Sequence, residues 1–283
     1  MRTKELHFLP QYNAFGIEKI VVDSTNETFW LELNDKCYVI MGLPVPDEDA
    51  PKIAFVLGEE VGYYTIDFNY ALAIAKTGAR VVLITRGLHC DEPLNECHGL
   101  VLPGGAFASP KRYYAAFEQD KHQDEPNARH DAYVQCLHKA LFLGIPILGV
   151  CAGAQIIACE LGGFLFTDER KLHGEIEHKS KQKEAHMVSI IKPGCLLEKI
   201  FKKKVFKVNS RHSEGVYEIA LGSPLYIYAV APDGIPEAWG NEGEDVLCVQ
   251  WHPEDLAADG DAANQRIYDW LTRRAEAFQK RSA

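Results

Sequence analysis

Cys151 is the residue best placed in this sequence to act as a nucleophile. It follows the apolar run 146–150, which predicts a buried strand, and it opens segment 151–161, whose small and apolar residues predict a helix. Glycines stand two residues before and two residues after it, an arrangement that permits a tight strand-to-helix turn projecting the side chain. The helix N-terminus favours a thiolate there. The sequence therefore predicts a reactive thiol, although a buried cysteine can also be only a small hydrophobe.

A general base for this thiol is expected at His252. The residue comes just after the apolar run 246–250, so it can stand at a strand end, far from Cys151 in sequence and near it in the fold. Glu254, two residues later, could orient the imidazole from its other ring nitrogen. A His-x-Glu pair alone is common on protein surfaces, so it indicates a catalytic role only when a candidate nucleophile such as Cys151 is also present. Together the three residues predict a catalytic triad.

Backbone donors for an oxyanion are expected after the short apolar run Gly99–Leu102. Gly104 and Gly105 follow this run, and residues without side chains let backbone N–H groups face a pocket. With the neighbouring Ala106 and the N–H of Ala152, they predict an oxyanion hole for a tetrahedral intermediate. Gly-Gly after a strand more often marks an ordinary turn, so this prediction also depends on the cysteine.

The elements that must position these residues alternate between strand and helix patterns. Apolar runs at 52–57 and 80–85 flank a segment of helical periodicity at 65–77, which is a βαβ pattern. The polar segment 118–130 predicts a surface loop. Further strands are expected at 99–102, 187–191, 204–209, 225–231 and 246–250, with helices at 130–144 and 262–278. This alternation predicts an α/β fold with a largely parallel central sheet, in a catalytic domain over residues 51–283.

Residues 1–50 predict an N-terminal extension. Segments 17–23 and 28–33 could pair as a hairpin, and prolines before the acidic stretch 47–49 are typical of a linker. The N-terminus has no apolar stretch of the secretory type, and no later segment has the roughly 20 apolar residues of a membrane span. The eight cysteines are scattered along the chain, which is typical of reduced thiols. We therefore expect a cytoplasmic protein without a membrane partner.

The charge balance argues against nucleic acid as a partner. Thirty basic and forty acidic residues give a formal net charge of -10, whereas phosphate contacts require clustered Lys and Arg. The lysine-rich run 179–183 is expected to face solvent. Neither a cofactor nor a metal is expected, because segments 89–98 and 173–178 lack standard zinc-ligand spacings. The sequence leaves open whether the chain forms a homo-oligomer.

The order of the Gly-Gly, the elbow cysteine and the His-Pro-Glu segment resembles the class I glutamine amidotransferase superfamily. The resemblance extends to its gamma-glutamyl hydrolase branch, which includes gamma-glutamyl-gamma-aminobutyrate hydrolase. Val-Asn-Ser-Arg-His at 208–212, Ala-Pro-Asp-Gly-Ile-Pro-Glu-Ala at 231–238 and the Pro-x-x-Tyr at 110–113 are similar to motifs of that branch. By this resemblance the fold would be a flavodoxin-like sandwich, and the substrate would be a small gamma-glutamyl amide.

The resemblance also implies which residues surround the substrate. The candidates are Gln155, Ser210, Arg211, His212 and Phe107. Three of the chain's residues or pairs depart from the branch pattern: Ala152 replaces an Arg, Phe107 replaces an Asp, and Ser213-Glu214 replaces a His-Gln pair. We expect the triad to be kept and the pocket to differ, with less positive charge and one more aromatic ring.

Three functions are compatible with these residues. The leading one is a free-standing hydrolase that cleaves a gamma-glutamyl amide through a thioester on Cys151. A glutaminase subunit that supplies ammonia to a separate synthetase would use the same triad, so the triad cannot separate the two. A non-catalytic binding or regulatory protein on the same fold would need no triad, which weighs against it.

Overall fold

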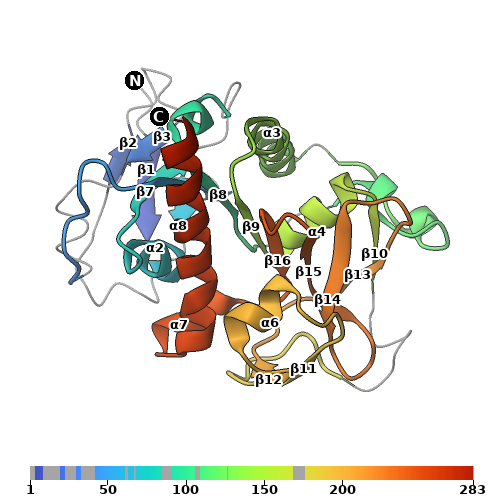
Figure 1. The fold of residues 1–283 in the computed structure, drawn as a ribbon. Coiled ribbons are helices and arrows are strands. Elements are labelled where there is room, and N and C mark those ends of the chain that lie inside the picture. Colours follow the sequence, from blue (N-terminus) through green and yellow to red (C-terminus); the bar gives the residue numbers. More distant parts are fainter. Residues whose placement is uncertain are drawn as a thin grey trace. The chain divides into compact units, whose positions relative to one another are not determined.

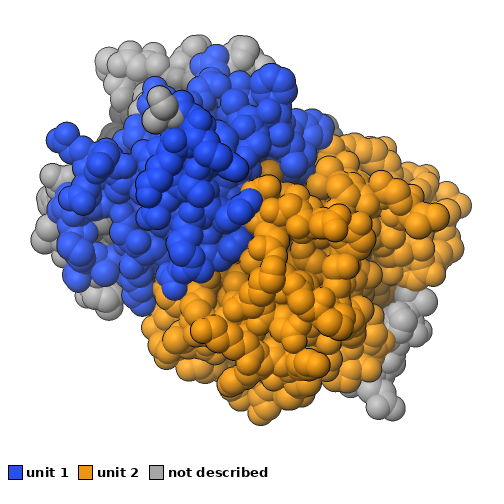
Figure 2. Space-filling view, in the orientation of Figure 1, with its two compact units in different colours: residues 1–101, 131–146, 268–283 blue, residues 102–130, 147–267 orange. Residues whose placement is uncertain are grey.

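The chain forms two compact units (Figures 1 and 2). Unit 1 comprises residues 1–101, 131–146 and 268–283, and unit 2 comprises residues 102–130 and 147–267. The computed structural model describes residues 4–8, 20–22, 30–32, 42–60, 63–66, 68–84, 91–105, 109–125, 127–167 and 176–282. The fold is α/β, and its mixed sheet has a parallel core, as the alternating pattern predicted. Among the described residues, every helix is too short or too polar to cross a bilayer.

The main sheet of unit 1 is built around a βαβ segment. Its elements are β3 (Trp30–Glu32), β4 (Lys52–Val56), α2 (Phe68–Ala75), β7 (Arg80–Ile84) and β8 (Gly99–Leu102). The strand order is β8-β4-β7-β3, with β4 parallel to both neighbours and β3 antiparallel to β7. All but the first residue of β4 and β7 are buried, which explains their continuous apolar sequences. The βαβ prediction is confirmed.

A second sheet of unit 1 involves the N-terminal residues. Its strands are β1 (Lys4–Phe8), β2 (Ile20–Val22), β5 (Gly58–Glu60) and β6 (Tyr63–Ile66), in the order β2-β1-β6-β5. The expected hairpin between segments 17–23 and 28–33 is wrong, because β2 pairs with β1 whereas β3 pairs with β7. The apolar alternation identified strands correctly but could not identify their partners.

The main sheet of unit 2 contains six strands. They are β9 (Ile147–Val150), β11 (His186–Ile190), β12 (Val205–Val208), β14 (Leu225–Val230), β15 (Pro236–Asn241) and β16 (Val246–Val249). Their order is β12-β11-β14-β15-β16-β9, where β9 and β16 are parallel and the other neighbours are antiparallel. Five of the six were expected within two residues of their observed bounds, and β15 was not.

The remaining elements complete the two units. They are α3 (Ala128–Leu143), α4 (Ala152–Glu160), β10 (Gly163–Thr167), α6 (Leu196–Phe201), β13 (Glu214–Ile219), α7 (Pro253–Ala258), α8 (Ala262–Ser282), and the short 3-10 helices η3 (Glu92–Glu96), η4 (Lys111–Tyr113) and η5 (Gln119–Lys121). Strands β10 and β13 pair antiparallel as a separate ribbon in unit 2. The elements that position the candidate site residues are β9, α4, β16 and α7.

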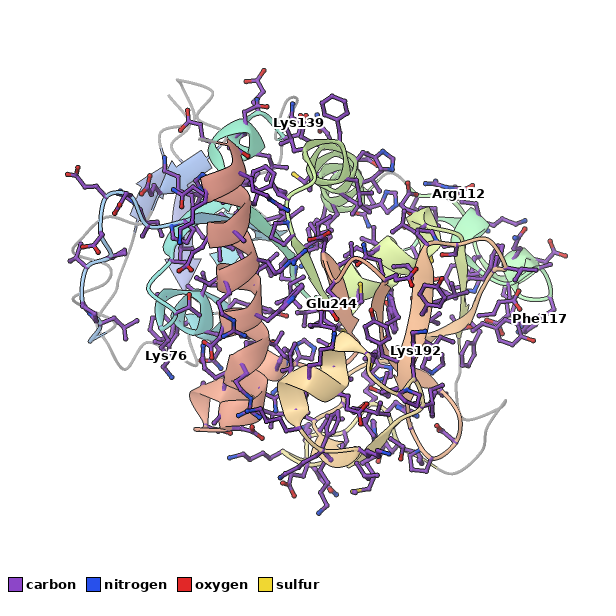
Figure 3. The ribbon with its side chains drawn as sticks, viewed as in Figure 1. Lys76, Arg112, Phe117, Lys139, Lys192 and Glu244 are labelled. Carbon is purple, nitrogen blue, oxygen red and sulfur yellow. The ribbon has the colours of Figure 1, made fainter. Side chains whose placement is uncertain are left out.

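The expected surface loop 118–130 is only partly a loop. Glu118 is buried, and its Oε2 accepts hydrogen bonds from the backbone N–H of Thr167 at 2.5 Å and from its hydroxyl at 2.7 Å. Next to it, Phe117 is exposed (Figure 3). Its ring packs edge-on against that of Tyr217, with ring centroids 5.3 Å apart. The polar composition of this segment therefore includes a carboxylate that fixes the end of β10, which a solvated loop would not need.

Candidate active site

Cys151 lies at a sharp turn between β9 and α4. Its backbone has φ 49° and ψ -112°, a conformation that is unfavourable for a residue with a side chain. The neighbouring glycines are required by close approach: a Cβ at Gly149 would lie 2.8 Å from the Cα of Ala154, and a Cβ at Gly153 would overlap the carbonyl oxygen of Leu102. The Gly-x-Cys-x-Gly sequence thus forms an elbow with the cysteine at the N-terminus of α4.

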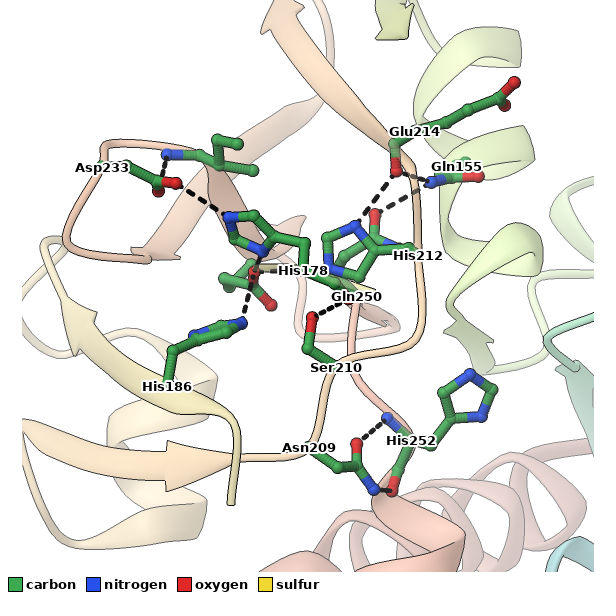
Figure 4. Close-up of polar contacts among 12 residues, drawn as sticks. Gln155, His178, His186, Asn209, Ser210, His212, Glu214, Asp233, Gln250 and His252 are labelled. Atoms are coloured by element: carbon green, nitrogen blue, oxygen red, sulfur yellow. Dashed lines mark hydrogen bonds and ion pairs between the residues drawn. The ribbon is translucent and has the colours of Figure 1, made fainter. Parts of the chain in front are cut away.

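His252 and Glu254 lie at the N-terminus of α7. The Nδ1 of His252 and the Oε1 of Glu254 are 2.6 Å apart, and the glutamate is fully buried. Asn209 holds the backbone of His252, because its Nδ2 donates to the His252 carbonyl oxygen at 2.9 Å and its Oδ1 accepts from the His252 N–H at 2.8 Å (Figure 4). The preceding Trp251 is fully buried and donates its indole N–H to Asn264 at 2.9 Å. Since Nδ1 faces the carboxylate, Nε2 is the nitrogen left for a thiol.

The electrostatics of the site favour a thiolate and an imidazolium. Burial alone would raise the pKa of Cys151, but the charge and hydrogen bond of His252, the nearby His212 and the N–H of Ala152 together lower it. Burial alone would lower the pKa of His252, but the Glu254 carboxylate and the Cys151 thiol raise it well above its usual value. The two shifts have opposite directions, toward a thiolate on Cys151 and toward an imidazolium on His252, and each charge stabilises the other.

The Gly-Gly segment after β8 adopts a conformation that requires glycine. Gly105 has φ +138°, and a Cβ there would approach the Arg129 guanidinium carbon to 2.8 Å. The Arg129 Nη2 donates to the carbonyl oxygen of Gly104 at 2.6 Å, which fixes the direction of this peptide. Gly105 lines the same cavity as the cysteine. The neighbouring candidates Ala106 and Phe107 lie outside the described residues.

A cavity of about 400 Å³ opens beside Cys151 within unit 2. Three of the expected substrate-binding residues, Gln155, Arg211 and His212, line it together with the cysteine and His252. The fourth, Ser210, is fully buried and does not line the cavity. The structure therefore brings together the three triad candidates and most of the expected pocket residues.

Hydrogen bonds to backbone atoms fix two of the side chains that line the cavity. Gln155 donates its Nε2 to the carbonyl oxygen of Glu214 at 2.6 Å and to Oε1 of Gln250 at 3.2 Å (Figure 4). His212 Nδ1 lies 3.2 Å from the same Glu214 carbonyl oxygen. Both side chains therefore brace the start of β13, and their position in the wall is set before any ligand arrives.

Ser210 and Arg211 are the other two described candidates for substrate binding, and each has a polar or charged partner. The Ser210 hydroxyl donates to the carbonyl oxygen of His178 at 2.6 Å, so it supports the wall from behind. Arg211 forms an ion pair with Asp255, with 2.5 Å between Nη2 and Oδ2. The positive charge of Arg211 is thereby offset at the edge of the cavity.

Sequence reasoning missed three residues of this site. Lys179 is exposed, as expected for the lysine-rich run, and it also lines the cavity, which was not expected. Ser109 lines it from the segment after the Gly-Gly. Asn209 clamps His252, and its place in the Val-Asn-Ser-Arg-His segment was the signal that could have identified it. Lys179 carried no comparable signal, because only the fold brings it beside Arg211.

The fold and the elbow cysteine beside a histidine–carboxylate pair define a class I glutamine amidotransferase-like protein. The chain belongs to the Peptidase C26 family, whose family model matches residues 55–254. That match includes Cys151, His252 and Glu254. The resemblance to the superfamily is thus confirmed at this level.

Relatives and solved structures agree with this assignment. A Schizosaccharomyces pombe protein with the provisional name glutamine amidotransferase is 28% identical over 230 residues, which cover 80% of this chain and 89% of that protein. A Mycobacterium tuberculosis protein with a similar provisional name is 32% identical over 210 residues, 70% of this chain and 64% of its own length.

A Thermoplasma acidophilum structure with the provisional name of a GMP synthase component has a TM-score of 0.57 at 16% identity, covering 83% of this chain and 99% of that one. The Trypanosoma brucei CTPS glutaminase domain has a TM-score of 0.55 at 20% identity, covering 81% and 94%. These two structures share the fold.

The pKa directions predict selective labelling of Cys151. The Cys151 pKa is lowered from that of an ordinary thiol, so at mildly acidic pH a larger fraction of Cys151 than of an unshifted thiol is in the reactive thiolate form. Burial raises the pKa of Cys159, Cys195 and Cys248. We expect a haloacetamide to modify Cys151 first, as read by peptide mapping. Urea-denatured protein, in which all eight thiols react, is the control, and an unmodified Cys151 beside another labelled cysteine would contradict the expectation.

Proposed function

We propose that this protein hydrolyses a gamma-glutamyl amide bond by nucleophilic catalysis with Cys151. The observation that carries the proposal is the elbow cysteine in a cavity with His252, whose Nδ1 lies 2.6 Å from Glu254. A buried carboxylate that orients an imidazole beside a lowered-pKa thiol is the arrangement needed for acyl transfer. The provisional glutamine amidotransferase names of the relatives support the same bond as the target.

The proposed reaction has two steps. In the first, the Cys151 sulfur forms a bond to the gamma-carbonyl carbon, and His252 gives its proton to the departing amine as the C–N bond breaks. In the second, His252 takes a proton from water, the hydroxide attacks the thioester carbonyl, and glutamate leaves while the thiolate is restored. The N–H of Ala152 and the Gly-Gly backbone are the donors proposed for the oxyanion in both steps.

The charges in the cavity fit the glutamyl part of such a substrate. A glutamyl group has an alpha-carboxylate and an alpha-ammonium group. Lys179 and Glu214 both line the cavity and carry one charge of each sign. The Glu214 carboxylate is held in place by the Tyr114 hydroxyl, which donates to it at 2.8 Å. We propose that these two side chains hold the amino-acid end of the substrate.

A glutaminase that supplies ammonia to a separate synthetase is the second candidate. The fold neighbours named as a GMP synthase component and as the CTPS glutaminase domain favour it. The two candidates differ in their dependence on a partner. A free-standing hydrolase turns over gamma-glutamyl amides as the purified single protein, whereas a glutaminase that serves a synthetase is slow alone and accelerates when its synthetase is added.

The leaving group is expected to be a neutral or cationic amine. Ala152 has no charge and the charge of Arg211 is offset by Asp255. Once Lys179 holds the glutamyl end, the described residues that line the cavity therefore offer no further cation to a carboxylate on the leaving group. A steady-state panel of gamma-glutamyl amides tests both the activity and this preference. We expect kcat/KM for a gamma-glutamyl polyamine to exceed that for gamma-glutamyl-gamma-aminobutyrate by about tenfold. A preference for the carboxylate-bearing substrate would contradict the specificity, and inactivity on the whole panel would contradict the function.

A further inference from the structure

Three imidazoles and one carboxylate converge in the interior of unit 2, and one of the imidazoles, that of His212, also lines the catalytic cavity. They belong to His178, His186, His212 and Glu237, which are 3%, 8%, 4% and 0% exposed. The four come from separate places: the segment before β11, β11 itself, the segment before β13, and β15. Figure 4 shows the rings of His178, His186 and His212 grouped together. Buried groups of this kind need a stated partner, because unpaired polar groups are costly in an apolar interior.

The distances from the Glu237 carboxylate to the three imidazoles are close to those between ligands that share a metal ion. The Glu237 Oε1 lies 3.3 Å from His178 Nδ1, 3.4 Å from His186 Nε2 and 3.6 Å from His212 Nε2. All four ligand atoms lie within 4.8 Å of one another. Charge-assisted hydrogen bonds are shorter, at about 2.7–2.9 Å. A tetrahedron with metal–ligand bonds of about 2.0–2.1 Å has edges of about 3.3 Å, which is the spacing seen around this carboxylate.

The outward-facing nitrogen of each ring has its own acceptor. His178 Nε2 lies 2.8 Å from Asp233 Oδ2, His186 Nδ1 lies 3.1 Å from the Met187 carbonyl oxygen, and His212 Nδ1 lies 3.2 Å from the Glu214 carbonyl oxygen. Carbonyl and carboxylate oxygens only accept, so a metal bound at the centre would leave the proton of each neutral ring on its outward nitrogen. The inward nitrogen then presents its lone pair to the centre.

This pattern matches metal-bound histidine, whose free nitrogen usually donates to a carboxylate or carbonyl. Lone pairs that face a carboxylate repel it unless a cation lies between them. Consistent with this, His186 Nε2 and both Glu237 oxygens have no hydrogen-bond partner among the described residues. The centre therefore has the donors and the charge that a divalent cation requires.

We propose that His178, His186, His212 and Glu237 bind one zinc ion in a closed tetrahedral site. Zinc is the metal that fits three imidazoles and one carboxylate in four-coordinate geometry. The near-complete burial of all four side chains leaves no open position, which is typical of a structural rather than a catalytic zinc.

The proposed zinc would stabilise the wall of the catalytic cavity. Ser210 donates to the backbone of His178, and Asn209, which clamps His252, is three residues before His212. A metal that ties His178 and His212 together would hold this segment against the sheet. The site is a proposal about stability and folding, and it stands or falls independently of the reaction that the protein catalyses.

The test is the metal content of the full-length protein, purified without a metal-affinity tag and without chelators. Elemental analysis is expected to find about one zinc per chain, and anomalous scattering at the zinc edge is expected to place it between the four side chains. A strong chelator should remove it and lower the melting temperature, and zinc alone should restore both. Metal-free folded protein that binds no added zinc would overturn the proposal.

Variants locate the metal. His186→Ala removes a ligand and should reduce the zinc content to a small fraction. Asp233→Asn, which changes only the partner of His178, should weaken zinc binding by about 10- to 100-fold, whereas Asp259→Asn, a control at an exposed ion pair, should not. Cys151→Ser should keep its zinc. Loss of zinc from Cys151→Ser, or full zinc in folded His186→Ala and Asp233→Asn, would overturn the assignment.

Discussion

Replacing His252 by alanine is expected to lower kcat by roughly 10⁶-fold, whereas Glu254→Gln is expected to lower it by roughly 10³- to 10⁴-fold. Without the imidazole, the thiol loses the group that lowers its pKa, and the departing amine loses its proton donor. A glutamine at position 254 can still accept from Nδ1 through its amide oxygen, so the ring keeps its orientation and loses only a charged partner. Initial rates on a saturating gamma-glutamyl amide measure both effects.

The control for these variants is His138→Ala. His138 is exposed on α3 and does not line the cavity, so its loss is expected to leave kcat unchanged. Thermal unfolding must be measured alongside, because Glu254 is fully buried. If Glu254→Gln were as inactive as His252→Ala at unchanged melting temperature, the carboxylate would have a larger role than orienting the ring.

Gly153→Ala is expected to destabilise the protein by about 3 kcal/mol and to remove most of its activity. The new Cβ would overlap the carbonyl oxygen of Leu102, a backbone atom that cannot rotate away as a side-chain end can. Relief requires α4 to move away from Leu102, which displaces both Cys151 and the Gly104-Gly105 segment. Urea unfolding monitored by tryptophan fluorescence measures the stability change.

A matched substitution separates this overlap from the general effect of adding a methyl group. A Cβ at Gly99 would meet Ala275 and Leu271 side chains at 3.5 Å, which is ordinary contact. Gly99→Ala is therefore expected to change the free energy of unfolding by less than about 1 kcal/mol. Equal stability of the two variants would show that α4 and Leu102 can separate without cost, and that the elbow does not need its second glycine.

The sequence predicted those parts of the site whose conformation is determined by residues close together in the chain. The turn at Cys151 depends on glycines two residues to either side, and the His252 turn depends on a strand end followed by Pro253, so short-range sequence is sufficient for both. The parallel strands were predictable because burial on both faces leaves continuous apolar runs, as in β4, β7 and β9.

The parts that escaped prediction depend on partners distant in sequence. β15 has the sequence Pro-Glu-Ala-Trp-Gly-Asn, in which turn-forming residues hide a strand that is buried between β14 and β16. The same strand contains Glu237, whose burial makes sense only with three histidines from other segments. Local zinc spacings are absent from such a set, so a metal site of the kind that we propose could not be recognised from the sequence. Glu118 was assigned to a surface loop for the same reason, since its partner Thr167 lies on β10.

The most direct test of the central claim is to trap the acyl-enzyme. Protein quenched with acid during turnover of a gamma-glutamyl anilide, whose good leaving group favours accumulation of the thioester, is analysed by intact-mass and peptide mass spectrometry. We expect the mass of the peptide that contains Cys151 to increase by one gamma-glutamyl group. This adduct should be removed by hydroxylamine and should be absent from Cys151→Ala. Turnover by Cys151→Ala at the wild-type rate, or a gamma-glutamyl adduct on another residue of an active enzyme, would contradict it.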